Sequence, residues 1–583
     1  MKFSYVAQRF EEIEKESSRI SMTALLAELF NQASAHEAQI ISYLSSGSLF
    51  PPYKAVQFNI SQKGIIPIVA QLLQQDDVAV QKEFKKHGDV GLLFQDSWNY
   101  KDHGLTVKQI YDSLVECAKI SGIGSTEKKQ THLIQLLKQV DMLSAKYVLR
   151  IIAGTLRLGF SDMTIIDALS WMQVGDKSIR KDIEHAYNIC ADLGLVAFIL
   201  KHDGMNGIED IQIHVGIPIR PAAAERLSSS EEIIKKLGSS VAQPKLDGFR
   251  VQVHVKKSKN HQEIEFFSRN LLDMSEMFPD LKKAVESIDV KSLICEGEAI
   301  VFDEDTEIFL PFQETVKRKR KHNVEQASHD LPLRLYLFDV LYLDGVSLLD
   351  KPHHERRVIL ENLVVDKKRS PLHVIEEQRV TTAKELHAYF LKNIHAGLEG
   401  LVVKRDDAIY QPGKRNFNWI KLKRHARGML VDTIDCVILG YYVGQGKRAK
   451  FGVGAFLVGV YNKKKDIFQT VAKIGTGMKD EEWKDLKKRC DHMRQEKKPY
   501  QVDVPKELYP DVWVVPKIIC TIQSDEITLS PIHSAEAIDS ESGLALRFPR
   551  FIMYRPDKSE FDATTVTELQ DLYRQQKTDV VKS

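Results

Sequence analysis

The lysine at position 245 stands where a reactive group could be held. The stretch VAQPKLDGFRVQVHV, residues 241–255, puts Lys245 just ahead of Asp247-Gly248, a pair that favours a turn. Apolar and polar residues then alternate with period two, which predicts a half-buried strand. Lys245 is therefore expected in a bend that feeds a strand, and a rigid sheet can position a reactive amine there. On this stretch alone a solvated loop lysine is the favoured alternative, so the rest of the chain has to decide.

Two carboxylates interrupt an apolar segment further on. In LICEGEAIVF, residues 293–302, Glu296 and Glu298 are two apart and so lie on the same face of the predicted strand. Carboxylates side by side repel unless a cation joins them, and a metal ion or a cationic side chain is the simplest partner. A strand with one wet face is an equally good alternative for this segment.

Paired lysines mark a second strand. In NWIKLKR, Trp419, Lys421 and Lys423 share one face. Two ammonium groups that project together need an anion, for which phosphate is the natural candidate, whereas lysines that protect an edge strand are the alternative. Upstream, Glu399 and Lys404 are five apart, so a regular strand puts them on opposite faces. Both can serve one site only if Glu399 precedes the strand or a bulge intervenes.

The composition excludes some classes of protein. The chain has 583 residues, 43% hydrophobic and 28% charged, and its 82 Lys and Arg nearly balance its 80 Asp and Glu. A net charge of +2 does not indicate a nucleic-acid binder, so any basic surface must be local. The six cysteines lack metal-ligand spacing and are expected as buried free thiols of a reducing compartment. With no secretory pattern at the start and no membrane-spanning apolar run, a soluble intracellular protein without a membrane partner is expected.

The spacing of apolar residues changes twice along the chain. Apolar spacing at three and four predicts helices at 21–33, 64–75, 128–140 and 145–159, with Ser161-Asp162 as a further helix cap. Period-two patterns predict strands at 250–255, 263–268, 292–303, 333–345, 399–405 and 418–424, and later at 435–444, 454–462, 468–475, 512–522 and 545–555. The order is an all-helical domain, an α+β domain and a small β-barrel-like domain, joined near 214–227 and at HARGML, residues 425–430.

The charged motifs occur in a fixed order along the chain. KLDGFR, FFSRN, CEGEAIVFD, LFDVLYLDG, EGLVVK and WIKLK, followed by RFPRFIMYRPDK, resemble the nucleotidyltransferase motif series of ATP-dependent DNA ligases. KKHGDVG (85–91) and GTLRLGFSDMTIIDAL (154–169) are similar to the helical DNA-binding domain of the archaeal and eukaryotic replicative type. The resemblance covers nearly the whole chain. It favours a reactive Lys245 over the alternative of a solvated loop lysine.

This resemblance implies three domains and one reaction. It implies an all-α DNA-binding domain over 1–215, an α+β nucleotidyltransferase (adenylation) domain over 216–427 and a β-barrel OB-fold domain over 428–583. Enzymes of this family use ATP and Mg²⁺, for which Mn²⁺ can substitute. They seal 5′-phosphate/3′-hydroxyl nicks in duplex DNA, through a lysyl-AMP and an adenylated DNA, in replication, repair and recombination. Nicked duplex DNA is thus the expected partner of a monomer, in the cytoplasm and at the nucleoid if the host is prokaryotic. A sliding clamp stays open as a second partner, because the chain has no clear clamp-binding peptide.

The resemblance also assigns roles residue by residue. Lys245 is the nucleophile that attacks the α-phosphate of ATP and becomes an AMP-phosphoramidate. The implied ATP-binding residues are Gln243, Lys245, Arg250, Arg269, Glu298, Phe338, Arg415, Lys421 and Lys423. Among these, Phe338 would stack on adenine, and Arg250 and Arg269 would contact ribose and phosphate. The implied Mg²⁺ ligands are Glu298 and Glu399; Lys404 and Trp419 belong to the same site; Arg555, Asp557 and Lys558 form the barrel motif that helps pyrophosphate leave.

Two positions depart from the family pattern. Gln243 stands where relatives often carry a glutamate that reads the adenine amino group, and its carbonyl can still accept that hydrogen bond. Pro556 lacks an N–H inside RPDK and restricts that loop. ADP and GTP stay open as alternative donors.

Four other functions are compatible with parts of the pattern. They are an mRNA capping guanylyltransferase, an RNA ligase, an NAD-dependent ligase and a non-catalytic DNA-binding scaffold. The long helical region ahead of Lys245, the lack of a cysteine zinc module and the intact charged motifs favour an ATP-dependent DNA ligase instead.

Overall fold

The structure is a computed structural model, and its described residues form two compact units. It describes residues 1–54, 56–87, 89–94, 98–154, 156–303, 308–310, 312–318, 323–364, 370–396, 398–423, 433–444, 446–537 and 542–582. The first unit spans 1–59, 101–144 and 160–426, and the second spans 60–100, 145–159 and 427–583. The predicted junction at 425–430 lies outside the described residues.

Helices make up the N-terminal part of the first unit. They are α1 (Phe3–Lys15), α2 (Arg19–Gln32), α3 (Ala35–Ser45), α6 (Val107–Lys119), α7 (Ser125–Leu137), α9 (Asp162–Val174), α10 (Arg180–Cys190) and α11 (Leu193–Glu209). α2 packs on α9, and α3 packs on α11. The helices predicted at 21–33 and 128–140 are confirmed as α2 and α7. Ser161 holds the N-cap position of α9 as predicted, although its side chain makes no capping hydrogen bond.

The second unit has a helical part of its own. α4 (Gln62–Leu73) and α5 (Asp77–His87) pack on each other, and α8 (Met142–Ile152) belongs to this unit from residue 145 onward. α4 and α8 confirm the helices predicted at 64–75 and 145–159, although α8 ends earlier than predicted. Gly154, with φ 65°, follows its end in the left-handed conformation that stops an α-helix.

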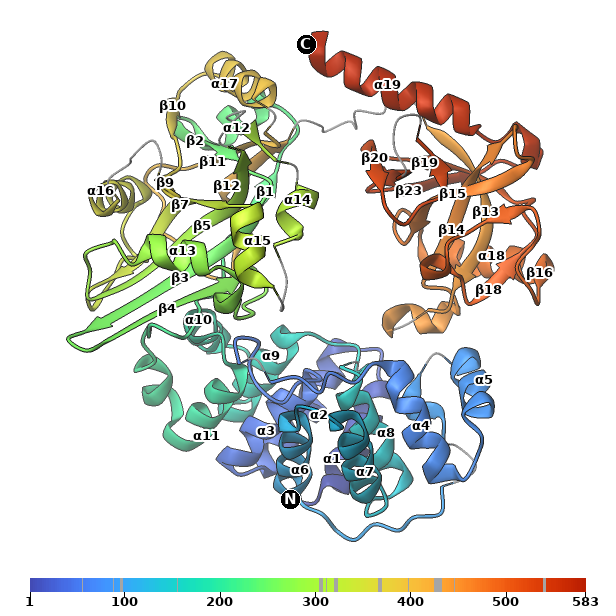
Figure 1. Ribbon diagram of the computed structural model, residues 1–583. Coiled ribbons are helices and arrows are strands. Elements are labelled where there is room, and N and C mark those ends of the chain that lie inside the picture. The colour runs from blue at the N-terminus through green and yellow to red at the C-terminus, as the bar shows by residue number, and fades with distance from the viewer. Residues whose placement is uncertain are drawn as a thin grey trace. The chain divides into compact units, whose positions relative to one another are not determined.

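Two sheets carry the rest of the first unit (Figure 1). One has the order β1-β12-β11-β2-β10; the other has the order β4-β3-β5-β7-β8, with β6 paired to β5 and β9 to β7. The strands are β1 (Ala223–Arg226), β2 (Ser240–Lys245), β3 (Phe249–Ser258), β4 (His261–Ser268), β5 (Ser292–Asp303), β6 (Ile308–Phe309), β7 (Leu333–Leu343), β8 (Val346–Ser347), β9 (Leu372–Val374), β10 (Gln378–Val380), β11 (Gly400–Lys404) and β12 (Arg415–Lys423). The helices are α12 (Ser230–Leu237), α13 (Pro279–Val285), α14 (Phe312–Val316), α15 (Val324–Asp330), α16 (His353–Leu363) and α17 (Ala383–His395).

Each of these sheets buries one face and leaves the other for polar side chains. On β3, Val251, Val253 and Val255 are buried in a core shared with α13, and the predicted alternation is confirmed. α12 and α17 cover one face of the β2-β11-β12 sheet, where Leu401 and Val403 are buried (Figure 1). Side chains one residue away along these strands must point to the opposite face.

Lys245 ends a strand instead of standing in a bend. β2 pairs with β11 on one side and with β10 on the other, and the sequence pattern did not predict it. Pro244 lies inside β2, and a proline without an N–H argues against a central strand. The predicted bend was therefore misplaced: the turn residues Asp247 and Gly248 follow the strand that carries Lys245.

Strands dominate the C-terminal part of the second unit. They are β13 (Ile434–Tyr442), β14 (Ala455–Asn462), β15 (Ile467–Ile474), β16 (Arg494–Gln495), β17 (Val502–Asp503), β18 (Val512–Val514), β19 (Ile519–Gln523), β20 (Glu526–Ser530), β21 (Ala535–Glu536), β22 (Gly543–Arg547) and β23 (Arg550–Tyr554), with helices α18 (Asp480–His492) and α19 (Val566–Lys582). The order β16-β18-β13-β14-β15-β17, with β19 joining β13 to β23, is an open path through the described residues, next to a sheet β20-β22-β21. The predicted β-rich domain is confirmed, but these pairings do not close a barrel.

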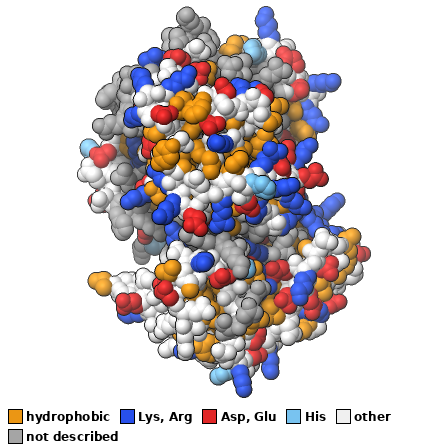
Figure 2. All heavy atoms as spheres, turned by 90° about the vertical axis from the view of Figure 1, so that its right-hand side faces the viewer, with side chains coloured by type: hydrophobic (Ala, Val, Ile, Leu, Met, Phe, Trp, Pro, Cys, Tyr) orange, Lys and Arg blue, Asp and Glu red, His pale blue; other side chains and the backbone are white. Residues whose placement is uncertain are grey.

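The cysteines, the apolarity of the helices and the exposed apolar residues can be compared with what the composition predicts. All six cysteines are free and buried, as predicted. Within the described ranges, no helix is both long and apolar enough to cross a bilayer. Figure 2, seen from the side on which Figure 1 draws the C-terminal strands, shows hydrophobic side chains gathered among Lys and Arg. The exposed apolar residues of this part include Leu529, Phe548, Ile552 and Met553.

Candidate active site

The register of three strands places the predicted lysines side by side. Lys245 on β2 lies opposite Gly400 on β11, which in turn lies opposite Lys423 on β12. Gly400 has φ 145°, and a Cβ there would stand 2.1 Å from the Leu422 carbonyl oxygen, so only glycine fits. No side chain therefore separates the two lysines in this row.

Glu399 joins these two lysines. It directly precedes β11, which is one of the two arrangements that its spacing from Lys404 allowed. One carboxylate oxygen accepts from Lys245 Nζ, and the other accepts from Lys423 Nζ. Burial alone would raise the pKa of the Glu399 carboxyl, but the two ammonium groups outweigh burial and lower it. The nucleophile candidate is thus held by an ionised carboxylate.

A cluster of cations surrounds Lys421 on β12. Burial lowers the pKa of Lys421, and nearby positive charges lower it further. These charges are Arg415, Lys423, Arg269 and Lys245. The predicted phosphate-binding residues are therefore brought together, and such a concentration of cations suits a polyphosphate.

Glu298 is an acidic residue beside this cluster, and the charges of Lys245 and Arg250 act on it. The Gly248 N–H donates to its Oε1 at 3.1 Å, which the lack of a side chain at Gly248 permits, because a Cβ there would stand 2.3 Å from the Ala299 carbonyl oxygen. Burial raises the pKa of Glu298 to about 7, even though Lys245 and Arg250 oppose this shift. A half-buried carboxyl with such a pKa is suited to bind a cation.

The donor set fits a metal that is shared with a substrate. In the described part of the chain, no three His, Cys, Asp or Glu side chains form a ready metal site. Mg²⁺ is commonly bound by one or two carboxylates together with substrate phosphates, and Glu298 is suited to that role. Glu399, the second predicted ligand, has each of its oxygens in contact with a lysine.

Glu296 has partners of its own. Arg250 Nη2 donates to both of its oxygens, at 3.0 and 2.8 Å, and Tyr410 OH donates to Oε2 at 2.8 Å. The sequence predicted either a metal ion or a cationic side chain as the partner of the Glu296 and Glu298 carboxylates. For Glu296 the partner is a cationic side chain, that of Arg250. Sequence spacing gave no signal for Tyr410, which lies 114 residues away.

The aromatic rings of Phe338 and Trp419 lie next to Arg250 and Lys404 of the site. The guanidinium of Arg250 lies 5.4 Å from the Phe338 ring centroid and 5.6 Å from that of Trp419. Lys404 is buried, donates to the Phe338 carbonyl oxygen at 3.1 Å and lies 4.3 Å from the Trp419 ring. Burial lowers the pKa of Lys404 to about 8, against the upward pull of Asp339. Phe338 is half-buried, and its ring also contacts that of Trp419 edge-on at 6.1 Å between centroids.

Gln243 has a partner that sequence analysis missed. Its Nε2 donates to Glu377 Oε2 at 2.7 Å, and His353 Nε2 contacts the same oxygen at 2.9 Å. Burial alone would raise the pKa of Glu377, but the hydrogen bond from His353 and the charges of His353 and Lys404 lower it to about 2. Because Glu377 is 134 residues from Gln243, no local pattern could have linked them.

The predicted residues of the C-terminal motif form a separate cluster in the second unit. Arg555 Nη1 and Lys558 Nζ both donate to Asp435 Oδ2, at 3.1 and 2.7 Å, and Thr521 donates to the other oxygen at 2.6 Å. Arg555 also pairs with Asp557 at 2.7 Å. Asp435 was not predicted, yet it fixes both cations of the motif.

The two helical-domain motifs meet in the second unit. Asp89, from KKHGDVG, is buried and accepts from Arg150 at 2.5 Å, and it lies 3.4 Å from Arg157 of GTLRLGF. The side chains of Lys85 and Lys86, and all of Gly88, lie outside the described residues. A buried ion pair therefore ties together segments that the sequence singled out independently.

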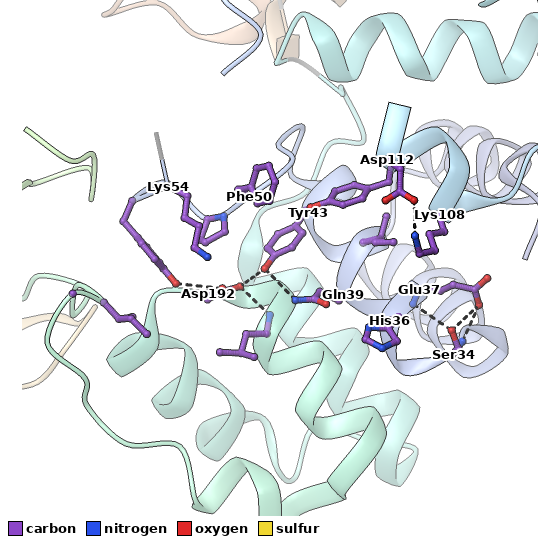
Figure 3. Close-up of a pocket in the computed structure, with 17 residues that line it drawn as sticks. Ser34, His36, Glu37, Gln39, Tyr43, Phe50, Lys54, Lys108, Asp112 and Asp192 are labelled. Atoms are coloured by element: carbon purple, nitrogen blue, oxygen red, sulfur yellow. Dashed lines mark hydrogen bonds and ion pairs between the residues drawn. The ribbon is translucent and has the colours of Figure 1, made fainter. Parts of the chain in front are cut away.

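A cavity of about 820 Å³ opens elsewhere in the first unit (Figure 3). Tyr43 points at Asp192 and donates to its Oδ1 at 2.7 Å, while Tyr53 donates to Oδ2 at 3.3 Å. Asp192 also caps α11 by accepting from the Leu195 N–H at 2.9 Å. None of the residues predicted to carry the chemistry lines this cavity.

Comparisons with protein families match most of the chain. The family described as "DNA ligase N terminus" matches residues 2–170, "ATP dependent DNA ligase domain" matches 221–423, and "ATP dependent DNA ligase C terminal region" matches 449–558. The predicted site residues from Gln243 to Lys423 lie inside the second match, and Arg555 to Lys558 lie inside the third.

Individual relatives match over their full length. The chain is 44% identical to "Probable DNA ligase" of Dictyoglomus turgidum, covering 100% of this chain and 99% of the relative. It is 37% identical to "DNA ligase" of Sulfurisphaera tokodaii, covering 98% of each. The solved structure "Pmar-Lig_PreS3" covers 94% of this chain and 99% of its own with a TM-score of 0.56, and its 15% identity supports the fold alone.

Proposed function

Because this chain belongs to the family of ATP-dependent DNA ligases, we propose that Lys245 carries AMP between ATP and a nicked DNA end. The enzyme seals 5′-phosphate/3′-hydroxyl nicks, and the match at residues 2–170 separates it from the capping guanylyltransferase and RNA ligase alternatives. The observation that carries the assignment is the row of Lys245 and Lys423 joined by Glu399, beside the cations around Lys421.

In the first step Lys245 Nζ attacks the α-phosphate of ATP. The Lys245 ammonium group first gives one proton to water, which frees the lone pair of Nζ. The P–N bond then forms, the P–O bond to pyrophosphate breaks, and a second proton leaves Nζ for water. Glu399 contacts Nζ and so orients the nucleophile before ATP is attacked. Lys421, Lys423 and Arg415 stabilise the charge that moves onto the phosphates.

Glu298 is the carboxylate proposed to hold Mg²⁺. Its oxygen atoms have one backbone donor, Gly248, and its raised pKa favours a nearby cation. When bound, Mg²⁺ supplies charge stabilisation to the phosphates. Glu399 stays a proposed second ligand, alongside its contact with the two lysines.

The later steps transfer AMP to the 5′-phosphate at the nick and then release it when the 3′-hydroxyl attacks. We assign DNA binding to the helical region over 1–215 and to an OB-fold over 428–583, which precede and follow the adenylation domain over 216–427 in the sequence. Arg555, Asp557 and Lys558 are proposed to act while pyrophosphate leaves. Nicked duplex DNA is the proposed partner of a monomer.

The test is formation of a covalent adduct with ATP and Mg²⁺. The intact protein should gain one AMP, and peptide mapping should place it on Lys245. Lys245→Ala should abolish the adduct, whereas Lys256→Ala, a change at an exposed lysine on β3, should leave it intact. An adduct on another residue, or one that survives in Lys245→Ala, would remove Lys245 from the mechanism.

A further inference from the structure

The side chain of Gln243 has one hydrogen-bond partner that bears on its chemistry. Its amide donates to the carboxylate of Glu377 at 2.7 Å. Two carboxylates at that distance would repel, so a carboxylate at 377 makes an amide the compatible partner at 243. The two positions therefore act as a pair.

Glu377 dictates which end of the amide faces it. A carboxylate has only acceptor oxygens, so the Gln243 atom in contact must be the NH₂ group. Glu377 is itself held by buried His353, which contacts the same oxygen at 2.9 Å. Gln243 is 2% exposed and cannot turn over without breaking this bond. The carbonyl oxygen Oε1 must then point away from Glu377.

That oxygen is an open acceptor in the face that carries Lys245. Among the described residues, no group donates a hydrogen bond to Gln243 Oε1. Gln243 lies opposite Val402 on β11, which lies opposite Lys421 on β12. Val402 is half-buried and apolar, and Lys404, two residues along the same face, contacts Phe338. A purine edge with a hydrogen-bond donor would satisfy this acceptor.

We propose that Glu377 is a positioning residue that fixes the Gln243 amide with its oxygen toward the base and so selects adenine over guanine. This inference rests on the proposed function of the site. Adenine offers an amino donor at position 6, whereas guanine offers an oxygen there, which an acceptor repels. If the amide could turn over, its NH₂ group would accommodate guanine instead.

The experiment compares rates of lysyl-AMP and lysyl-GMP formation with ATP and GTP on the same protein preparation. In Glu377→Gln either orientation of the Gln243 amide finds a partner, so the preference for ATP should fall about tenfold, the worth of one hydrogen bond. Because the readout is a ratio, a partly inactive preparation does not change it. The matched control is Glu376→Gln, an exposed neighbour paired with Lys392, which should keep the preference.

A reciprocal exchange gives a second, independent readout. Gln243→Glu alone places two carboxylates together and should lose adduct formation, whereas Gln243→Glu with Glu377→Gln should recover both adduct and ATP preference. An unchanged ratio in Glu377→Gln, or an exchange no better than Gln243→Glu alone, would overturn the inference. Absence of any adduct in the unmodified enzyme would overturn the proposed function and this inference with it.

Discussion

Replacing Glu298 by glutamine is expected to stabilise the protein at alkaline pH while it abolishes lysyl-AMP formation. Glu298 is held by one backbone donor, and burial raises its pKa from 4.5 to about 7. In the unfolded chain the same carboxyl loses its proton near the ordinary value. Between these two pH values the folded state binds more protons, so stability falls as pH rises and the loss is complete above the folded pKa.

The change in the free energy of unfolding follows from the shift of the Glu298 pKa. About 1.36 kcal/mol for each pH unit gives a cost of about 3 kcal/mol for the ionised carboxyl above the folded pKa. Glutamine has no proton to lose, and its Oε1 can still accept from the Gly248 N–H. The free energy of unfolding of Glu298→Gln should therefore exceed that of the unmodified protein by less than about 1 kcal/mol at pH 5 and by up to about 3 kcal/mol at pH 8.

Urea unfolding at the two pH values measures this difference, with Glu276→Gln, an exposed acid on the same unit, as the control. The variant should also lose adduct formation with ATP and Mg²⁺, because the carboxylate proposed to hold the metal is gone. The reasoning fails if the gain of Glu298→Gln is the same at pH 5 and pH 8, since the destabilisation would then not come from ionisation.

Two further changes probe the second unit. Arg555→Ala or Lys558→Ala should slow lysyl-AMP formation and largely spare sealing of a nick that already carries AMP, because only the first step expels pyrophosphate; equal losses in both assays would assign these residues to folding or DNA grip. Asp89→Asn should lower the free energy of unfolding by about 3–5 kcal/mol in a urea titration, because the buried Arg150 would lose the carboxylate charge that Asp89 supplies; a loss below about 1 kcal/mol would mean that the pair is not needed there.

The local sequence determined the strands and the faces of the site. Period-two alternation predicted β3, β5, β7 and β12, because side chains of a strand alternate between a wet and a buried face. It also placed Trp419, Lys421 and Lys423 on one face, and the register with β11 confirms this. The family was indicated by the resemblance of the ordered motifs, those of the helical region included, to ATP-dependent DNA ligases.

The strand that carries Lys245 was not predictable from its own residues. β2 contains Pro244 and spans only Ser240–Lys245, too short and too irregular for a periodic signal. It exists because β10 and β11 pair with it on both sides. Pairing across long sequence separations is a property of the assembled sheet, so the local structure around Lys245 was predicted wrongly, while its role as the nucleophile stays a prediction.

The partners of the charged residues were decided only by the tertiary structure. Glu377 contacts Gln243 from 134 residues away, and Asp435 holds Lys558 from 123 residues away. Spacing rules report on neighbours along one helix or strand, whereas a buried charge takes whichever partner the packed fold brings within hydrogen-bond distance. The sequence alone thus indicated the candidate groups for the chemistry, because their types and motifs are local, whereas packing decided which groups hold them in place.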